Sequence, residues 1–332
     1  MRDVAARAGV SPRTVSNVVR GYVHVSDDTR QRVQSVIDEL RYRPNVSAQS
    51  LRQGRTGLIA LAVPEIAAPY FAELADLVQR EAVARGVTLL IDQTGGDRAR
   101  EMLVLDGYHS NVIDGLILSP MAITGADLRA QALEIPTVLL GERIDASGGL
   151  LHVTIDNVAA ARAATAHLLD RGRRRIAAVG ADLTTDNVGP ALRRLHGYRL
   201  ALVDAGLAPV PELMVTTPGW AHGPAYAAVS ALLDRGTDVD AMFCFNDVLA
   251  LSAIRAVRAH GLRVPQDVAV VGWDDIAEAA YWTPSLTSVR PDKHGIAATA
   301  VDRLLALIAG EPVVDEQVTC GFELVVRESS GR

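Results

Sequence analysis

The first 45 residues carry short apolar faces with helical spacing, separated by residues that end helices. Residues 3–8 form the first such segment, and Gly9 ends it. Ser11 and Pro12 then predict a helix start, because serine caps free N–H groups and proline at the first position lacks an N–H. The apolar face of this second helix consists of three valines, Val15, Val18 and Val19.

A third helix is predicted from Ser26 onward. Asp27 and Asp28 place acids in its first turn, where the helix dipole favours negative charge. The apolar spacing then returns at Val33, Val36, Ile37 and Leu40. Three short helices, with the first two joined by a glycine turn, predict a helix-turn-helix unit.

Beyond residue 56 the pattern changes to continuous apolar runs of strand length. These runs are residues 56–64, 87–94, 112–120, 135–142, 175–181, 240–247 and 267–275. Amphipathic segments such as 71–85, 158–171 and 246–260 lie between them. This alternation predicts parallel sheets with helices on both faces. The expected fold class is therefore α/β, with two doubly wound lobes behind an all-α head.

Charge divides the chain at the same point. Residues 1–55 hold ten arginines against five acids, whereas the whole chain has a formal net charge of -6. A basic head on an acidic body predicts a polyanionic partner for the head alone. The 332 residues, 49% of them hydrophobic, favour a folded chain of at least two domains over a disordered one.

The pattern indicates neither a membrane protein nor a secreted one. No apolar run approaches the ~18 residues of a membrane-spanning helix, and the N-terminus lacks the apolar stretch of a secretion signal. Cys244 and Cys320 match no metal-ligand spacing and are expected to be free thiols in a reducing compartment. We therefore expect a cytoplasmic protein without a metal or cofactor.

The second predicted helix has a polar face that its valines leave outside. The outward positions are Pro12, Arg13, Thr14, Ser16, Asn17 and Arg20. Arg13 and Asn17 lie four residues apart and share that face. Arginine matches the two acceptors of guanine in the major groove, and asparagine matches adenine. An ordinary solvated face is the alternative, but the basic charge and the turn beside it favour reading of a DNA groove.

Residues 43–57 leave two interpretations open. Asn45 can cap a short helix that Gly54 closes, with Ala48, Leu51 and Arg52 on one side. A helix of about two turns is marginal alone in water, so the segment is either a frayed linker or a hinge helix that forms on DNA. In the second case Leu51 would be an apolar wedge that opens a base step from the minor groove.

The body contains polar strand ends but no familiar catalytic motif. The phosphate loop, the dinucleotide-binding loop, the nucleophile elbow and the H-E-x-x-H zinc motif are all absent from the sequence, and the eight histidines are scattered. A binding site is therefore better supported than an active site. The strand-end residues that suit a polyhydroxy ligand are Tyr70, Phe71, Trp220, Asn246, Asp247 and Asp274. Phe71 as a core residue and Asp247 as a helix cap are the alternatives for two of them.

Four motifs together resemble the LacI/GalR family of bacterial transcription regulators, over essentially the whole chain. They are "DVAARAGVSPRTVSNVVRG", "YRPNVSAQSLRQG", "FNDVLALSAIRA" and "VPQDVAVVGWDDI", in the order that the family has them. The resemblance implies a homodimer on a near-palindromic operator, with hinge leucines at its centre. The DNA-binding set then comprises Ser11, Pro12, Arg13, Thr14, Ser16, Asn17, Arg20, Asn45, Ala48 and Leu51.

The same resemblance implies a small-molecule effector between two periplasmic-binding-protein-like lobes. The implied effector residues are Tyr70, Phe71, Arg194, Trp220, Asn246 and Asp274. The chain would cross between the lobes near Asp156, Leu286 and Gln317. The expected divisions are a head (1–44), a hinge (45–55) and a body (56–332), the N-lobe being 56–155 with 287–316 and the C-lobe 156–286 with 317–332.

Several positions depart from the family pattern. Arg193 beside Arg194 leaves the register of the effector arginine open by one residue. Gly141 stands where several sugar-binding members have aspartate, and Arg143 leaves room for an anionic or phosphorylated effector. The first helix lacks the residues that usually precede it in the family. The run 322–332 is strand-like and polar rather than a heptad helix, which predicts a dimer without a tetramer-forming segment.

These observations predict a regulator that is not an enzyme, most simply a repressor that a sugar-like effector releases from DNA. Such a protein would be associated with the nucleoid while bound to DNA. Two other classes compete with it. A solute-binding protein of a transporter is disfavoured by the basic head, and a sugar kinase fused to a DNA-binding head is disfavoured by the missing phosphate loop.

Overall fold

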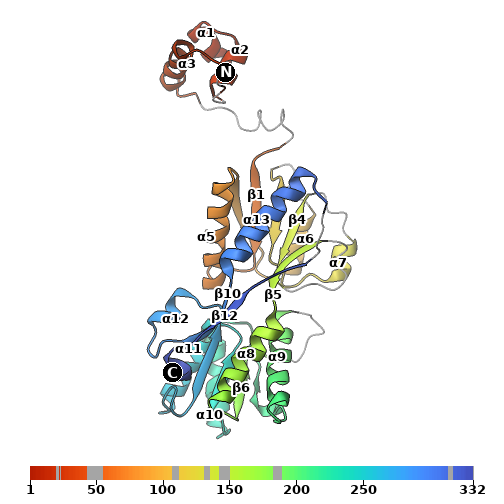
Figure 1. Cartoon of the computed structure of the whole chain (residues 1–332), viewed down its shortest axis with the longest axis vertical. Helices are drawn as coiled ribbons and strands as arrows, with labels where there is room; N and C mark the ends of the chain where they lie inside the picture. Colours follow the sequence, from red (N-terminus) through yellow and green to blue (C-terminus); the bar gives the residue numbers. More distant parts are fainter. Residues whose placement is uncertain are drawn as a thin grey trace. The chain divides into compact units, whose positions relative to one another are not determined.

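The computed structural model describes residues 1–19, 22, 24–42, 55–106, 112–130, 135–141, 150–181, 189–312 and 317–331. It divides into two compact units, Met1–Gly57 and Leu58–Arg332 (Figure 1). Within the described ranges, no helix has both the length and the apolar character of a bilayer-spanning segment.

The head unit contains the three predicted helices. They are α1 (Arg2–Ala8), α2 (Pro12–Val19) and α3 (Asp27–Glu39). Gly9 ends α1 with φ 65, a left-handed conformation that glycine adopts without a steric penalty. Leu40 does not join the apolar face as expected, because α3 ends at Glu39 and Leu40 turns outward to 41% exposure. The core consists of Val4, Ala5, Ala8, Val15, Val18, Val33 and Val36.

The body unit contains two lobes, each built on a six-stranded sheet. The strands of the first lobe are β1 (Leu58–Val63), β2 (Thr88–Gln93), β3 (Gly115–Leu118), β4 (Thr137–Leu140), β5 (Leu151–Ile155) and β11 (Gln317–Cys320). The strands of the second lobe are β6 (Ile176–Val179), β7 (Met214–Val215), β8 (Ala241–Cys244), β9 (Ala269–Trp273), β10 (Thr287–Pro291) and β12 (Phe322–Val325).

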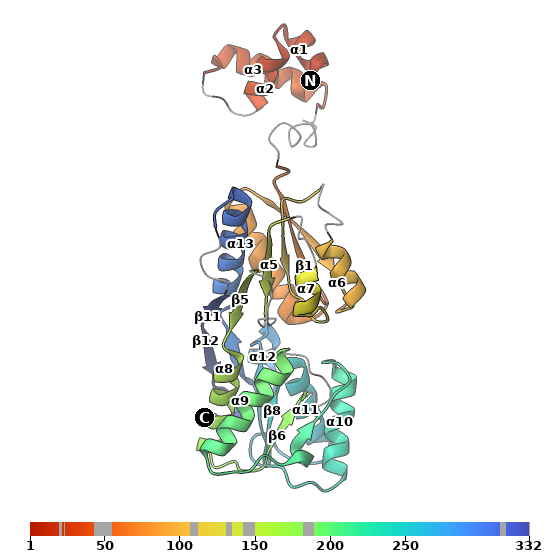
Figure 2. The same ribbon diagram turned by 90° about the vertical axis from the view of Figure 1, so that its right-hand side faces the viewer.

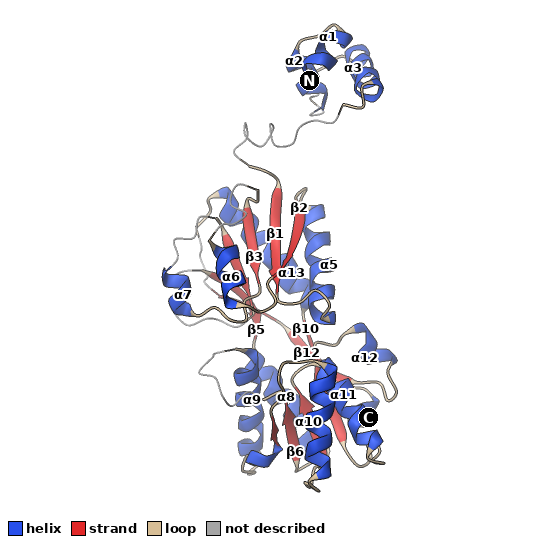
Figure 3. Cartoon of the chain, turned by 180° about the vertical axis from the view of Figure 1, so that it is seen from behind, coloured by secondary structure: helices blue, strands red, loops and turns tan. Residues whose placement is uncertain are grey.

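The first sheet is parallel and has the order β11-β5-β4-β3-β1-β2. Its helices are α5 (Pro69–Ala84), α6 (Arg98–Leu105), α7 (Gly125–Ala130) and α13 (Lys293–Ala309). Side chains alternate across a strand, so Ile59 and Leu61 pack in the core with α5 and α13, while Ala60 and Ala62 pack in the core with α6 and α7. Figure 3 shows the two helix layers on opposite faces. The edge strand β2 is not fully covered, and Ile91 is exposed there.

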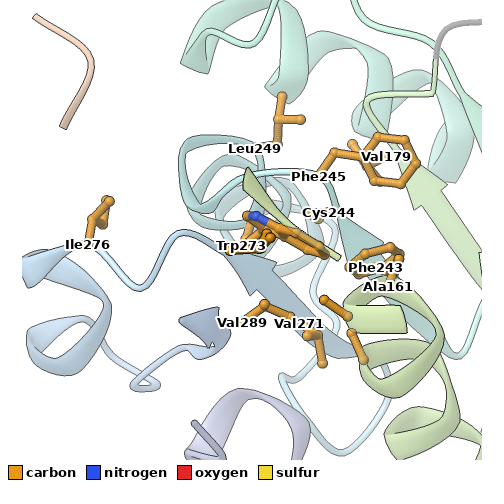
Figure 4. Close-up of a cluster of buried hydrophobic side chains, with 14 of the residues drawn as sticks. Ala161, Val179, Phe243, Cys244, Phe245, Leu249, Val271, Trp273, Ile276 and Val289 are labelled. Carbon is orange, nitrogen blue, oxygen red and sulfur yellow. The ribbon is translucent and has the colours of Figure 1, made fainter. Parts of the chain in front are cut away.

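The second sheet has the order β12-β10-β9-β8-β6-β7, with β12 antiparallel to β10. Its helices are α8 (Asn157–Asp170), α9 (Pro190–Asp204), α10 (His222–Asp234), α11 (Asp247–Ala259) and α12 (Ala277–Tyr281), with short 3-10 turns at Pro211–Leu213 and Glu328–Ser330. Figure 2 shows α8 and α9 on one face of this sheet and α10 and α11 on the other. Phe243, Phe245 and Trp273 are aromatic residues of its core, and the ring of Phe243 contacts the other two (Figure 4).

Strand pairing corrects two of the expected lobe boundaries. Residues 287–291 were expected in the first lobe, but β10 pairs with β9 of the second lobe, so the chain returns only before Lys293. Residues 317–320 were expected in the second lobe, but β11 pairs with β5 of the first, and the last crossing lies at Gly321. Apolar pattern does not reveal the partner of a strand, and pairing depends on contacts between distant residues.

Candidate functional site

In the head unit, Ser11 caps the helix that was expected to read DNA. Its Oγ accepts the N–H of Thr14 at 3.1 Å and lies 2.9 Å from the Thr14 hydroxyl oxygen. Pro12 and Arg13 are exposed, whereas Ser16 and Asn17 are half-buried. The first turn of α2 therefore presents its polar side chains outward. Four further expected DNA contacts lie outside the described residues, namely Arg20, Asn45, Ala48 and Leu51.

In the body unit, Arg194 of α9 is the centre of a buried cluster at the strand ends of the second lobe. Its Nε donates to Asn157 Oδ1 at 2.9 Å, and a terminal N–H donates to the backbone oxygen of Phe245. The guanidinium carbon lies 4.0 Å from the ring centroid of Trp273 and 5.3 Å from that of Trp220. Aromatic faces attract cations, so the two tryptophans hold the charge in place.

Trp220 is positioned by its neighbours rather than by a helix or strand of its own. Its ring meets that of Phe245 edge-on, with 6.4 Å between the centroids. Gly180, which follows β6, has φ 97, and a Cβ there would lie 3.3 Å from Trp220 Nε1 and 2.6 Å from a Leu249 methyl carbon. A glycine is therefore required at this strand end, for both its backbone conformation and the close approach of these side chains.

Asp274 follows β9 with φ 103, a conformation that non-glycine residues adopt only when their surroundings impose it. Burial raises the pKa of its carboxyl to about 7, while the charges of Arg194 and Lys293 oppose that rise and Glu73 adds to it. Burial also raises the pKa of Tyr70, and the Asp274 charge adds to that rise. The tyrosine of the first lobe and the aspartate of the second thus lie within electrostatic reach of each other.

The remaining first-lobe residue, Phe71, meets Tyr70 edge-on at 5.2 Å between centroids and packs against the core. It therefore has the core character that the sequence left open. Asn246 caps α11, because its Oδ1 accepts the N–H of Leu249 at 2.8 Å. Because the cap uses the side-chain oxygen of Asn246, the group of this side chain that can donate a hydrogen bond to a ligand is the amide nitrogen.

For Asp247 the sequence left a helix cap as the alternative to a ligand contact, and the helix-cap alternative is wrong, because Asn246 caps α11. The carboxyl of Asp247 is fully buried and accepts the N–H of Ile276 at 2.9 Å and the hydroxyl of Ser288 at 2.7 Å. Burial and the nearby Asp274 raise its pKa. The residue that caps α11 and the residue that makes these buried contacts are neighbours at the start of the helix. Local sequence does not show which of the two takes which role.

A cavity of about 350 Å³ lies beside this cluster, at the ends of β5 and β11. Its lining is Thr154, Ile155, Asp156, Asn157, Val158, Arg193, Gln317 and Thr319, which includes none of the six expected effector residues. Arg193 and Arg194 thus have different surroundings, since Arg193 lines the cavity and Arg194 lies in the buried cluster. We place the candidate site at the Arg194 cluster, because charged and aromatic groups of both lobes converge there, and Asn157 joins it to the cavity.

Sheet topology gives this position a physical reason. Within the two sheets, the orders β2-β1-β3-β4-β5 and β7-β6-β8-β9-β10 are the same. In such sheets a crevice forms outside the carboxyl ends of the strands, where connections leave in opposite directions. Gly180 follows β6 and Phe245 follows β8, so the cluster lies at the reversal point of the second sheet. In the described part of the chain, no three His, Cys, Asp or Glu side chains gather as a metal site would require.

Comparison with known proteins identifies the group to which the chain belongs. Residues 1–45 match the family of bacterial regulatory proteins described as the lacI family, and residues 165–330 match a periplasmic binding protein-like domain. The HTH-type transcriptional regulator GntR of Pseudomonas aeruginosa is 34% identical over 99% of this chain and 95% of its own length. The chain belongs to the LacI family.

Solved structures of the LacI family extend the likeness to the whole fold. The lac repressor dimer bound to operator and an anti-inducer has a TM-score of 0.87 and 27% identity, covering 99% of this chain and 98% of that one. A complex of the transcriptional regulator CelR with cellobiose has a TM-score of 0.73 and 33% identity, covering 98% of each chain. These relatives are named as regulators, which supports the assignment to a non-enzymatic class.

Sequence reasoning missed four residues of the candidate site, namely Glu73, Asn157, Trp273 and Lys293. Asn157 follows β5, which the apolar pattern did not predict because His152 and Thr154 interrupt it. Trp273 was taken only as the end of a strand, although its ring contacts Arg194. A polar residue within two positions of the end of every buried strand, counted for short strands as well, is the signal that would have found Asn157.

Proposed function

We propose that this LacI-family protein is a sequence-specific DNA-binding regulator, a repressor whose operator affinity depends on a small hydroxylated effector. The observation that carries the proposal is the presence in one chain of a capped helix with Arg13 exposed and a buried cluster around Arg194. The first suits a DNA groove, and the second suits a small ligand. The likeness to the operator-bound lac repressor supports the assignment of DNA binding to the head and ligand binding to the body.

The DNA half of the proposal places α2 in the major groove. Arg13 reads guanine and Asn17 reads adenine, while Ser11, Pro12, Thr14, Ser16 and Arg20 contact neighbouring base edges or phosphates. Residues 45–55 form the hinge, in which Asn45 and Ala48 support Leu51 as the minor-groove wedge. A homodimer presents two such heads, so the operator is near-palindromic.

The body, residues 56–332, carries the effector site and the contacts of the dimer. Trp220 provides an aromatic face for a sugar ring, and Asp274, Tyr70 and Asn246 provide groups that hydrogen-bond hydroxyls. In the proposal the effector is a neutral sugar. The likeness to CelR bound to cellobiose supports a sugar, and Arg143, which pointed to an anion, lies outside the described residues.

The effector controls DNA binding through the arrangement of the two lobes. Binding changes how the lobes sit on each other and therefore the spacing of the hinge segments in the dimer. The effector shifts DNA affinity only by its differential affinity for the two arrangements, typically ~1–3 kcal/mol. We propose that the effector lowers the affinity of the protein for its operator. The protein acts in the cytoplasm, on the nucleoid when it is bound to DNA.

Selection of bound fragments from the source genome, followed by gel-shift titration, tests the proposal. We expect a salt-sensitive preference for a near-palindromic sequence, weakened by a neutral sugar from a panel that begins with cellobiose. The same titration with phosphorylated sugars tests the ligand class. Binding without sequence preference would overturn the regulator, and a response to phosphorylated sugars alone would replace the neutral effector by an anionic one.

A further inference from the structure

Two charged side chains of the first lobe meet the second lobe at one turn. Glu73 lies on α5, Lys293 is the first residue of α13, and their side chains form an ion pair. Glu73 Oε1 also accepts the backbone N–H of Ala277 at 3.0 Å. Lys293 Nζ also donates to the backbone oxygen of Asp275 at 3.1 Å. Each member of the pair therefore contacts one backbone group of the other lobe.

The turn that receives these contacts, residues 274–277, is held within the second lobe. The carboxylate of Asp275 pairs with Arg290 at 2.7 Å and with Arg327 at 2.6 Å. Asp275 has φ 46, so its surroundings impose a left-handed backbone, and the N–H that follows donates to the buried Asp247. The turn therefore moves with the second lobe, and opening of the lobes must break both contacts with the first.

Partial burial strengthens these contacts between the lobes. The Lys293 side chain is 10% exposed and that of Glu73 is 31% exposed. Hydrogen bonds to charged groups are stronger than neutral ones, and salt screens them less where water is excluded. A lysine this far from water needs acceptors for its charge, and one of them belongs to the second lobe.

We propose that Glu73 and Lys293 form a latch on the 274–277 turn that sets how readily the two lobes open. Asp274 belongs to the same turn, so opening withdraws it from Tyr70. The latch therefore regulates the effector site by setting the population of the arrangement in which Asp274 lies near Tyr70. When that arrangement is less populated, its ligand binds with lower apparent affinity. This last consequence rests on the proposed function, whereas the latch itself does not.

The rival explanation is an ion pair that only stabilises the first lobe, since both side chains belong to that lobe. A charge exchange, Glu73→Lys together with Lys293→Glu, separates the two explanations. The exchange keeps an ion pair within the lobe. It also sets an ammonium group against the Ala277 N–H and a carboxylate against the Asp275 carbonyl, so donors face donors and acceptors face acceptors.

The test is small-angle X-ray scattering and thermal unfolding of the ligand-free full-length protein. We expect Glu73→Ala and the charge exchange to shift the radius of gyration to larger values. The exchange is expected to retain more thermal stability than Glu73→Ala, because its ion pair within the lobe persists. Glu81→Gln is the matched control, since Glu81 lies on the same helix and pairs with Arg85, the residue that follows that helix. This control is expected to leave the scattering curve unchanged.

A wild-type scattering curve from the charge exchange would overturn the latch, because an ion pair within one lobe would then be sufficient. If Glu73→Ala does not fold, Glu73→Gln replaces it. Glutamine still accepts the Ala277 N–H but no longer attracts Lys293, so a smaller shift of the same sign is expected, and no shift would also overturn the latch. Neither effector nor DNA is present, so a failure of the proposed function leaves this result intact.

Discussion

The guanidinium carbon of Arg194 lies 4.0 Å from the ring centroid of Trp273. The attraction of a cation to an indole face strengthens when water is excluded, and Trp273 is only 1% exposed. Asp274 follows Trp273 directly in the chain, so the same contact fixes the end of β9 beside the arginine. Changes in this cluster are therefore expected to alter the effector response and to leave the DNA-binding head unaffected.

Trp220→Ala is expected to abolish the effector response while DNA binding remains intact. The substitution removes the proposed stacking surface for a sugar ring, together with the contact to Arg194. Gel-shift titration with an active sugar measures the response. Trp282→Phe is the control, because Trp282 is an exposed tryptophan. It follows the 274–277 turn in sequence, whereas Trp220 precedes it. A response that survives in the Trp220 variant would remove this residue from the site.

Arg13→Ala is expected to cost about 1–3 kcal/mol of operator affinity and to relax the preference at one base pair. The physical reason is the loss of the proposed two-pronged contact to guanine from an exposed side chain at the start of α2. Binding to a set of single-base operator variants measures both effects. Arg32→Ala, on α3, serves as the comparison. An equal loss on every sequence would identify Arg13 as a phosphate contact instead.

The pKa of Asp274 predicts a stability that falls as pH rises. The folded protein keeps this proton up to about pH 7, whereas the unfolded chain loses it near the usual value of 3.8. The contribution is therefore complete below the unfolded pKa and lost as pH rises through 7, at a cost of about 2–3 kcal/mol between about pH 5 and about pH 8.

Urea unfolding of the wild type and of Asp274→Asn at the two pH values measures this difference. The variant is expected to lose less stability than the wild type over that interval, because asparagine does not titrate. Other carboxyl groups are present in both proteins, and Asp247 differs between them only in that the variant lacks the Asp274 charge that adds to the rise of its pKa. Equal pH dependence of the two proteins would show that the Asp274 pKa is not raised.

Gly272→Ala is expected to destabilise the body by about 1–3 kcal/mol. A Cβ at Gly272 would lie 2.2 Å from Asp247 Oδ1 and 3.1 Å from the Ala250 Cβ, so α11 or β9 must shift. The midpoint of urea unfolding measures the loss. Gly223→Ala is the matched control, because no atom lies within 4 Å of its added Cβ and alanine favours the helix there. An unchanged midpoint at Gly272 would contradict the close packing of Asp247.

Local features of the fold were predictable because they depend on neighbours in sequence. The run 240–247 contains β8, and the run 267–275 contains β9, since a continuous apolar stretch of strand length is buried in a parallel sheet. The Ser11 cap was predictable for the same reason, because its partner, the N–H of Thr14, lies three residues away.

The site was predictable only in part. Strand-end position pointed to Trp220 and Asp274, and resemblance to a family supplied Arg194, but neither supplied their partners Asn157 and Trp273. Asn246 rather than Asp247 caps α11, and Asp247 forms a buried link within the lobe, because the direction of a side chain at a helix start depends on what packs against it.

The sequence by itself determined that a basic three-helix head precedes an acidic body of alternating strands and helices. Apolar spacing, helix caps and charge are properties of short segments, so they can be read without knowing how the rest of the chain folds. Only the tertiary structure decided that β10 and β11 belong to opposite lobes, and that Glu73 and Lys293 meet the turn after β9. Those contacts join residues that are distant in sequence, and their energies exist only once the lobes have folded against each other.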